Sequence, residues 1–116
     1  MRHVARRLDD ENKPLSEPVL LILISLSDQP RHGYALLKDI EALSDGRVRM
    51  STGTLFGAIR RLLEDRWIEP VELDDTSRDK QSYRITPAGR QRLQADIDRM
   101  KYLAKAAGAR LKARRT

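Results

Sequence analysis

Residues 51–62, which read Ser51-Thr-Gly-Thr-Leu-Phe-Gly-Ala-Ile-Arg-Arg-Leu62, decide the fold of this chain of 116 residues. Ser51 is of a type that caps helix N-termini, so a helix is expected to begin directly after it. Apolar residues return at helical spacing on one side: Leu55, Ile59, Leu62 and Leu63. The opposite side presents small and basic residues: Thr54, Gly57, Arg60 and Arg61. The stretch therefore predicts an amphipathic helix with one face in the core.

Two more helices are expected before this one. Ser16, ahead of an acidic residue and a proline, predicts the start of a first helix that runs to about Ser27. Apolar side chains occupy every side of it between residues 19 and 26, which is typical of a helix enclosed by its neighbours. A second helix, with apolar residues at helical spacing, is expected from about His32 to Leu43, and Gly46 ends it.

A hairpin and a long helix are expected to follow. Residues from Trp67 to Leu73 and from Gln81 to Ile85 are rich in β-branched and aromatic side chains, which predicts two short strands joined by a polar tip. Thr86-Pro87 then opens a last helix that extends toward Arg110. Three helices, a hairpin and a long helix predict a mainly α-helical fold of the winged helix-turn-helix type, in which the third helix enters the major groove of DNA.

The length and composition fit one folded unit. We divide it into an N-terminal arm (1–15), a winged helix-turn-helix DNA-binding domain (16–86) and a C-terminal dimerisation helix with a basic tail (87–116). No apolar run approaches the roughly 18 residues that cross a bilayer, and no signal-peptide pattern is present, so we expect a cytoplasmic protein with no membrane partner. Because the chain has no cysteine and only two histidines, we expect neither a metal nor a cofactor.

The charge is unevenly distributed along the chain. The net charge is +6, of which residues 1–15 carry +1 and residues 99–116, with seven basic and no acidic side chains, carry +7. Residues 16–98 therefore carry a net charge of −2. A basic protein suggests a polyanionic partner, but a slightly negative body can bind DNA only through a locally concentrated basic face.

Three motifs in this order resemble the PadR family of transcriptional regulators. They are Arg31-His-Gly-Tyr34, the stretch 51–62, and Tyr83-Arg-Ile-Thr-Pro-Ala-Gly89, and together they span roughly residues 16–99. Phe56 stands where the family commonly has tyrosine, and Gly57 where it commonly has proline. The wing tip, residues 74–80, is more acidic than is usual in the family. The resemblance implies a DNA-binding repressor, but these departures predict a different operator preference.

The third helix and the wing hold most of the residues that we expect to contact double-stranded DNA. A helix in the major groove reads base edges near its N-terminus, and glycines let its backbone come close. The expected DNA-binding residues are Ser51, Thr52, Gly53, Thr54, Phe56, Gly57, Arg60, Arg61, Arg78, Lys80, His32 and Arg49. Several of these residues have a purely structural alternative: Ser51, Thr54 and His32 as helix caps, Arg60 and Arg61 as a solvated face paired with Glu64 and Asp65, and the wing cations as an ordinary loop.

The last helix carries a strict 4-3-4-3-4 alternation of apolar residues. They are Leu93, Ile97, Met100, Ala104, Ala107 and Leu111. Such a seam predicts a homodimer through this helix, and the alternative is packing on the chain's own first helix. The resemblance implies the same dimer, which would read a palindrome, and also a small aromatic effector bound between the wing domain and the dimer helices. We assign Trp67, Tyr34 and Tyr83 to structural packing.

Two alternatives to this function remain open. The same fold can serve protein–protein contact without an operator, and the acidic wing and the −2 body favour that alternative. The four arginines around the third helix argue against it: Arg47, Arg49, Arg60 and Arg61. An enzyme is disfavoured, since two histidines without a cysteine or a glycine-rich phosphate loop offer little from which to build a catalytic site.

Overall fold

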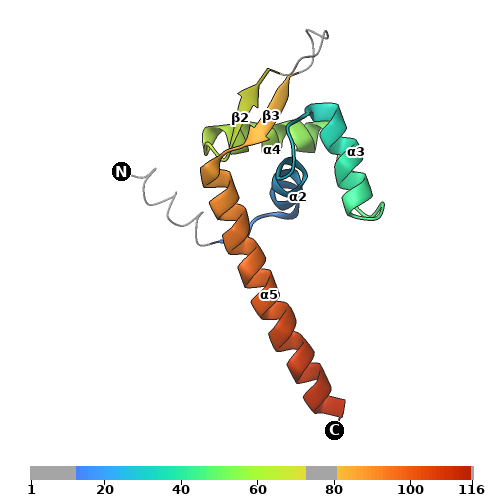
Figure 1. Ribbon diagram of the computed structural model, residues 1–116. Helices are drawn as coiled ribbons and strands as arrows, with labels where there is room; N and C mark the ends of the chain where they lie inside the picture. Colours follow the sequence, from blue (N-terminus) through green and yellow to red (C-terminus); the bar gives the residue numbers. More distant parts are fainter. Residues whose placement is uncertain (1–12, 73–80, 116) are drawn as a thin grey trace.

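The computed structural model describes residues 13–72 and 81–115. Its helices are α2 (Glu17–Leu26), α3 (Gly33–Leu43), α4 (Thr52–Glu64) and α5 (Pro87–Arg115), and its strands are β1 (Arg31–His32), β2 (Ile68–Val71) and β3 (Ser82–Ile85). In Figure 1, α2, α3 and α4 gather beside the sheet, and α5 runs away from them. The fold is mainly α-helical with a small antiparallel sheet, as the sequence predicts.

The core surrounds α2, which packs against α3, α4 and α5. Six aliphatic side chains of this core have no exposed surface: Ile22, Leu23, Leu36, Ile40, Leu55 and Leu62. Tyr83 and Ile85 of β3 and Leu93 of α5 close the same cluster. The prediction that the first helix is enclosed is therefore confirmed, and burial of this many aliphatic groups is the main force that holds the elements together.

The helices begin at the residues that the sequence marks. The Ser51 Oγ accepts a hydrogen bond from the Thr54 amide at 3.1 Å, and the His32 Nδ1 accepts one from the Ala35 amide at 3.3 Å. Ser16 precedes α2 in an extended conformation but makes no side-chain cap bond, so only its position was predicted correctly. After α3, Gly46 has a φ of +77° and donates its amide to the Glu41 carbonyl, which ends the helix.

The sheet has three strands in the order β1-β3-β2, one more than the sequence predicts. The expected hairpin is present as β2 and β3, in which Ile68 pairs with Ile85 and Val71 with Ser82. The additional strand β1 is only two residues long and pairs Arg31 with Tyr83. It ties the segment before α3 to the wing, so the start of α3 and the wing hairpin form one unit.

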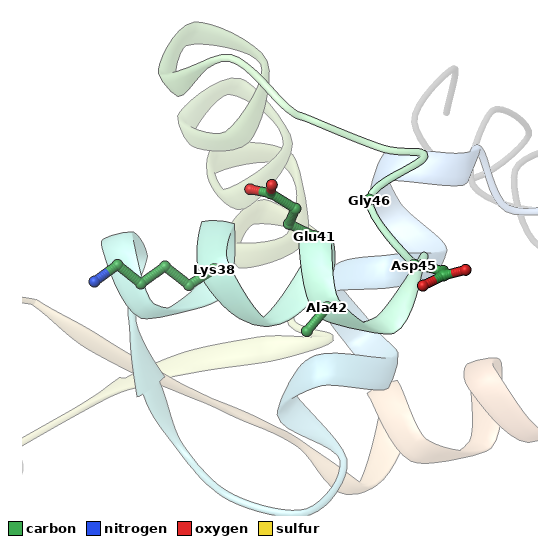
Figure 2. A pocket seen from close by; sticks show the side chains of 5 residues that line it. All are labelled: Lys38, Glu41, Ala42, Asp45 and Gly46. Carbon is green, nitrogen blue, oxygen red and sulfur yellow. The ribbon is translucent and has the colours of Figure 1, made fainter.

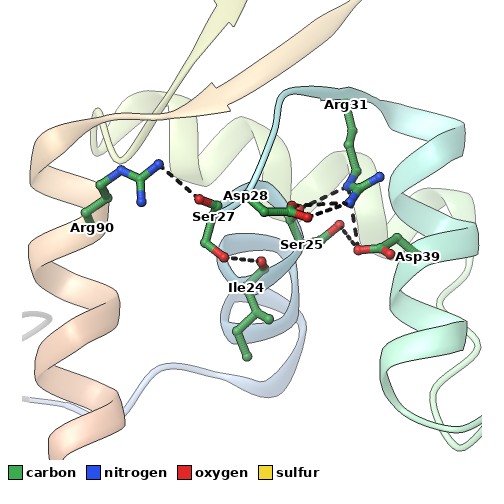
Figure 3. A network of polar contacts seen from close by, with 7 residues as sticks. All are labelled: Ile24, Ser25, Ser27, Asp28, Arg31, Asp39 and Arg90. Atoms are coloured by element: carbon green, nitrogen blue, oxygen red, sulfur yellow. Dashed lines mark hydrogen bonds and ion pairs between the residues drawn. The ribbon is translucent and has the colours of Figure 1, made fainter.

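A polar network joins α2, α3 and α5 at the turn after α2 (Figure 3). Arg31 lies between the carboxylates of Asp28, at 3.2 Å, and Asp39, at 3.6 Å, and its Nε donates to the Ser25 carbonyl at 3.0 Å. Ser25 also donates its hydroxyl to Asp39 at 2.5 Å. On the other side, Arg90 of α5 donates to the Ser27 carbonyl at 3.0 Å. Arg31 therefore has a structural role in this network, which holds α2 and α3 at a fixed angle.

The first half of α5 belongs to the domain, whereas its second half does not touch it. Leu93 is 6% exposed and Asp96 only 2%. Asp96 accepts the Leu15 amide at 3.4 Å and pairs with Arg99 at 3.3 Å, which anchors the segment that leads into α2. From residue 101 onward nearly every residue of α5 is exposed. Within the described ranges, no helix is long and apolar enough to cross a membrane.

Candidate nucleic-acid interface

The outer face of α4 has almost no side chains along its middle. Gly53, Gly57 and Arg60 follow one another at a spacing of four and three, opposite the buried Leu55 and Ile59. A Cβ built on Gly57 meets nothing within 4 Å, and one built on Gly53 meets only the Ser51 hydroxyl at 4.0 Å. The backbone of α4 is therefore open to solvent on this face, as a helix that approaches base edges closely requires.

Three exposed polar residues form the N-terminal end of this face. Ser51 caps the helix and also donates its hydroxyl to the Thr54 Oγ1 at 3.0 Å. Thr52 lies beside them and is exposed. The capping role that the sequence left open is real, and the exposure of all three side chains keeps them available for a second partner. Free amide groups and the positive end of the helix dipole at such a terminus attract phosphate groups.

The basic residues around α4 differ in their surroundings. Arg60 is exposed and makes no hydrogen bond or ion pair to any residue that the structure describes. Arg61 lies on the flank of α4 and lines a cavity near Trp67. Arg49, which is 79% exposed, pairs with Glu41 at 3.5 Å. Arg60 is therefore the arginine best placed on the glycine face.

The aromatic residues next to this face are arranged differently from the prediction. Tyr34, assigned to structural packing, is 59% exposed, so it does not pack in the core. Its ring meets the ring of Phe56 edge to face, with centroids 6.1 Å apart. The Cζ of Phe56 occupies the space beside Gly33, where a Cβ would come within 2.8 Å of it. Only a glycine at position 33 leaves room for the Phe56 ring, which explains the glycine of the Arg31–Tyr34 motif.

The wing is described only in part. Arg78 and Lys80, which we expect to contact DNA, lie outside the described residues. Within the sheet, Arg84 donates to Glu69 at 2.7 Å, across the β2–β3 pair. Tyr83 is 7% exposed, consistent with packing of the wing on the helices, and burial raises the pKa of its hydroxyl above the ordinary value.

The junction between the wing and α5 is the tightest part of the domain. Thr86 donates its hydroxyl to the Arg66 carbonyl at 2.7 Å, and its amide donates to the Trp67 carbonyl at 3.0 Å. The same hydroxyl accepts the Gly89 amide at 3.0 Å, so Thr86 caps α5 as the sequence predicts. This junction sets the direction in which α5 leaves the winged domain.

The residues of the predicted dimer seam divide into two groups. Leu93 is buried in the chain's own core and Ile97 packs against that core. Met100 is half-buried, and Ala104, Ala107 and Leu111 are exposed. The alternative of packing on the first helix therefore holds for the first half of α5, and only the seam of the second half has no partner among the residues that the structure describes. Leu103, which is 50% exposed and lies between Met100 and Ala107 on the same side, was missed because the 4-3 spacing passes over it.

Two hollows lie outside the α4 face. A cavity of about 200 Å³ lies between residues 13–16, α2, the end of α4 and α5, and Arg92 stacks over the Trp67 ring at its edge, 5.4 Å from the centroid. Trp67 itself is half-buried against the core. The second hollow, at the end of α3, is shallow: Lys38, Glu41 and Asp45 around it point in different directions (Figure 2). Residues 13–72 and 81–115 contain no group of three or more potential metal ligands.

A three-helix core, a small sheet with a wing hairpin, and an open helix face define a winged helix-turn-helix protein of the DNA-binding class. The sequence profile of the Transcriptional regulator PadR-like family matches residues 22–95, which is more than half of the chain. The chain therefore belongs to the PadR-like family of transcriptional regulators, which are DNA-binding regulators and not enzymes.

The chain is also similar to individual proteins. The chain is 35% identical over 85 residues to an uncharacterized 37.1 kDa protein in transposon Tn4556 of Streptomyces fradiae, covering 73% of this chain but only 23% of that protein. A transcriptional regulator from Clostridium thermocellum is 25% identical, with a TM-score of 0.67 over 78% of this chain and 89% of the other. A PadR family transcription regulator from Clostridium difficile shares the fold at 18% identity, with a TM-score of 0.70 over 83% and 99%.

Proposed function

We propose that this chain is a sequence-specific repressor that binds a palindromic DNA operator as a homodimer, with α4 in the major groove. The observation that carries this proposal is the outer face of α4, where Gly53 and Gly57 leave the backbone bare and Arg60 extends beside them. Glycine in the middle of an exposed helix costs about 1 kcal/mol relative to alanine. Gly57 lies in the interior of α4, and this cost has a physical reason if another molecule has to approach that face closely.

The chemistry of the face fits double-stranded DNA. Arginine contacts guanine edges or phosphates, and the Ser51–Thr54 turn presents hydroxyl and amide groups at the positive end of the helix. The body between residues 16 and 98 carries −2, so attraction to DNA depends on local cations and not on the overall field. Arg60, and the wing cations Arg78 and Lys80 outside the described residues, supply them in this proposal.

The homodimer is supported by the second half of α5. Apolar side chains lie on one side of it without a partner among residues 13–72 and 81–115: Met100, Leu103, Ala104, Ala107 and Leu111. We infer that a second copy covers this stripe, since two such helices bury each other's apolar side. A dimer presents two α4 helices to a palindrome, and by covering the operator it excludes other proteins, which is the simplest form of repression. We expect it to act in the cytoplasm.

A small aromatic effector forms part of the proposal. The cavity beside Trp67 combines an indole face with the cationic groups of Lys13, Arg61 and Arg92, which suits a planar anion. The cavity lies against both α4 and α5, so a ligand there is placed to change their relative angle. Because Trp67 is the only tryptophan, a titration with benzoate followed by its fluorescence tests the site directly.

The α4 assignment is tested with two variants that differ in their effect on stability but should both weaken binding. Duplexes are first selected from a random pool, and binding is measured by fluorescence anisotropy. We expect Gly57→Ala to raise the free energy of unfolding by about 0.5–1 kcal/mol and yet to weaken DNA binding, because a methyl group blocks the approach. Arg60→Ala should weaken binding about tenfold or more with little change in stability.

Lys105→Ala is the matched control, because it removes one positive charge from an exposed position of α5. It should leave affinity nearly unchanged. Unaltered binding by both α4 variants would show that α4 does not contact DNA and would favour a protein–protein role for the fold.

A further inference from the structure

The pair of aromatic rings Phe56 and Tyr34 leaves apolar surface exposed at the edge of α4. Phe56 is 37% exposed and Tyr34 is 59% exposed, although burial of a phenylalanine side chain is worth about 1.5–3 kcal/mol. The rings contact each other edge to face at 6.1 Å, so they form one apolar edge on the surface. An apolar edge next to a polar recognition face can contact another molecule that approaches that face.

The position of Phe56 on α4 connects this edge to the proposed DNA face. Phe56 follows Gly53 by three residues and precedes Arg60 by four, and residues at these spacings are neighbours on a helix surface. The ring is also held in place, because its Cζ and Cε1 lie against Gly33 at the start of α3. The phenyl group is therefore a fixed apolar wall of the glycine face, on the side of α3.

Among the base pairs, only those with thymine present an apolar group in the major groove. That group is the C5-methyl of the base, and phenylalanine is one of the side chains that contact it. We propose that Phe56, supported by Tyr34, reads a thymine C5-methyl group in each operator half-site. This inference rests on the proposed function, because it requires α4 to lie in the major groove.

The neighbouring arginine adds a spacing rule. Phe56 and Arg60 are four residues, about 6 Å, apart along α4, while base pairs are stacked about 3.4 Å apart. Arginine pairs best with guanine O6 and N7. The preferred half-site should therefore contain a thymine and a guanine within about two base pairs of each other.

Replacing thymine with deoxyuridine tests the proposal, because only the methyl group is removed. In a duplex selected from a random pool, each thymine of one half-site is replaced in turn. We expect one position at which affinity falls about fourfold, the effect of one methyl group leaving an apolar contact, and no effect at the others. With Phe56→Ala, the thymine and deoxyuridine duplexes should bind equally well at that position.

Phe56→Leu is the second variant, in case alanine loosens the packing on Gly33. Leucine keeps an apolar side chain at the position and should preserve the preference for thymine, and thermal melting confirms that both variants are folded. If the protein binds a duplex but every thymine tolerates deoxyuridine, or if Phe56→Ala keeps the full preference, the inference is wrong while the proposed function stands. If no duplex is selected at all, both fail.

Discussion

Gly89 lies so close to the wing that the domain cannot accommodate a larger residue there. A Cβ built on it comes within 2.1 Å of the Trp67 carbonyl oxygen and 2.8 Å of the Ile85 side chain. The carbonyl is fixed because it accepts the Thr86 amide, so it cannot move aside without breaking that bond. At this residue, the glycine of the Tyr83–Gly89 motif serves the geometry of the wing junction and not DNA contact.

We therefore expect Gly89→Ala to lower the free energy of unfolding by about 3 kcal/mol, the upper part of the range for overpacking in a rigid site. Gly108→Ala is the matched control, since Gly108 is in the same helix and a Cβ there meets nothing within 4 Å. It should raise stability by about 0.5–1 kcal/mol. Urea unfolding of both variants measures the difference, and equal effects would show that the close approach at Gly89 is relieved at no cost.

Strand β3 contains a buried tyrosine whose titration is linked to folding. Burial raises the pKa of Tyr83 above its ordinary value of about 10, because the charged form is disfavoured in the core. The stabilisation is fully present below about pH 10 and is lost as the pH rises through the raised folded-state pKa. The sheet should thus be sensitive to alkaline conditions.

The pH dependence is measured by thermal melting between pH 9 and about pH 11.5 for the wild type and Tyr83→Phe. We expect the wild type to lose more stability over this range than the variant, which has no ionisable group at the position. Parallel curves would contradict a buried, shifted Tyr83.

Helix α5 changes its surroundings halfway along its length. Its first half packs on α2 through Leu93 and Ile97, and its second half exposes Leu103 and Leu111 to 50% and 70%. One element thus holds the domain together and presents an apolar stripe beyond it. Tyr102, which is 73% exposed, lies on the side of α5 opposite this stripe.

If a second copy covers the stripe, Leu111→Gln should weaken the dimer about 100-fold, because each copy loses at least about 1.5 kcal/mol of apolar burial. The melting of the winged domain should change little, since Leu111 lies outside the core. Tyr102→Gln on the opposite side is the control and should leave the dimer intact. Sedimentation at several concentrations measures the dissociation constants; a monomeric wild type, or equal effects of the two variants, would exclude this stripe as the interface.

At the scale of the molecule, the parts that could be predicted are those whose cause is local. Helix starts at Ser51 and Thr86 follow from a capping side chain three residues before its amide partner, and this signal is visible in the sequence. Strand β1 could not be predicted, because two residues carry no periodic pattern and their pairing partner, β3, lies about fifty residues further along the chain. The sequence also does not show at which residue of α5 the apolar seam stops packing on its own domain.

The candidate site shows the same division. The glycine face and Arg60 follow from helical periodicity, so the sequence places them together correctly. The exposure of Tyr34 does not follow, because it depends on Phe56 filling the space beside Gly33, a contact between two helices. The cavity beside Trp67 likewise needs four segments to come together and has no signature in any one of them.

The most direct measurement is the affinity of the purified chain for a selected duplex as a function of salt, by fluorescence anisotropy with the stoichiometry determined in the same titration. We expect two chains per duplex and an affinity that falls by about a thousandfold between roughly 50 and 200 mM salt, as several phosphate contacts release their counterions. Absence of binding to any selected duplex, or binding that salt leaves unchanged, would contradict a dimer that reads DNA through α4.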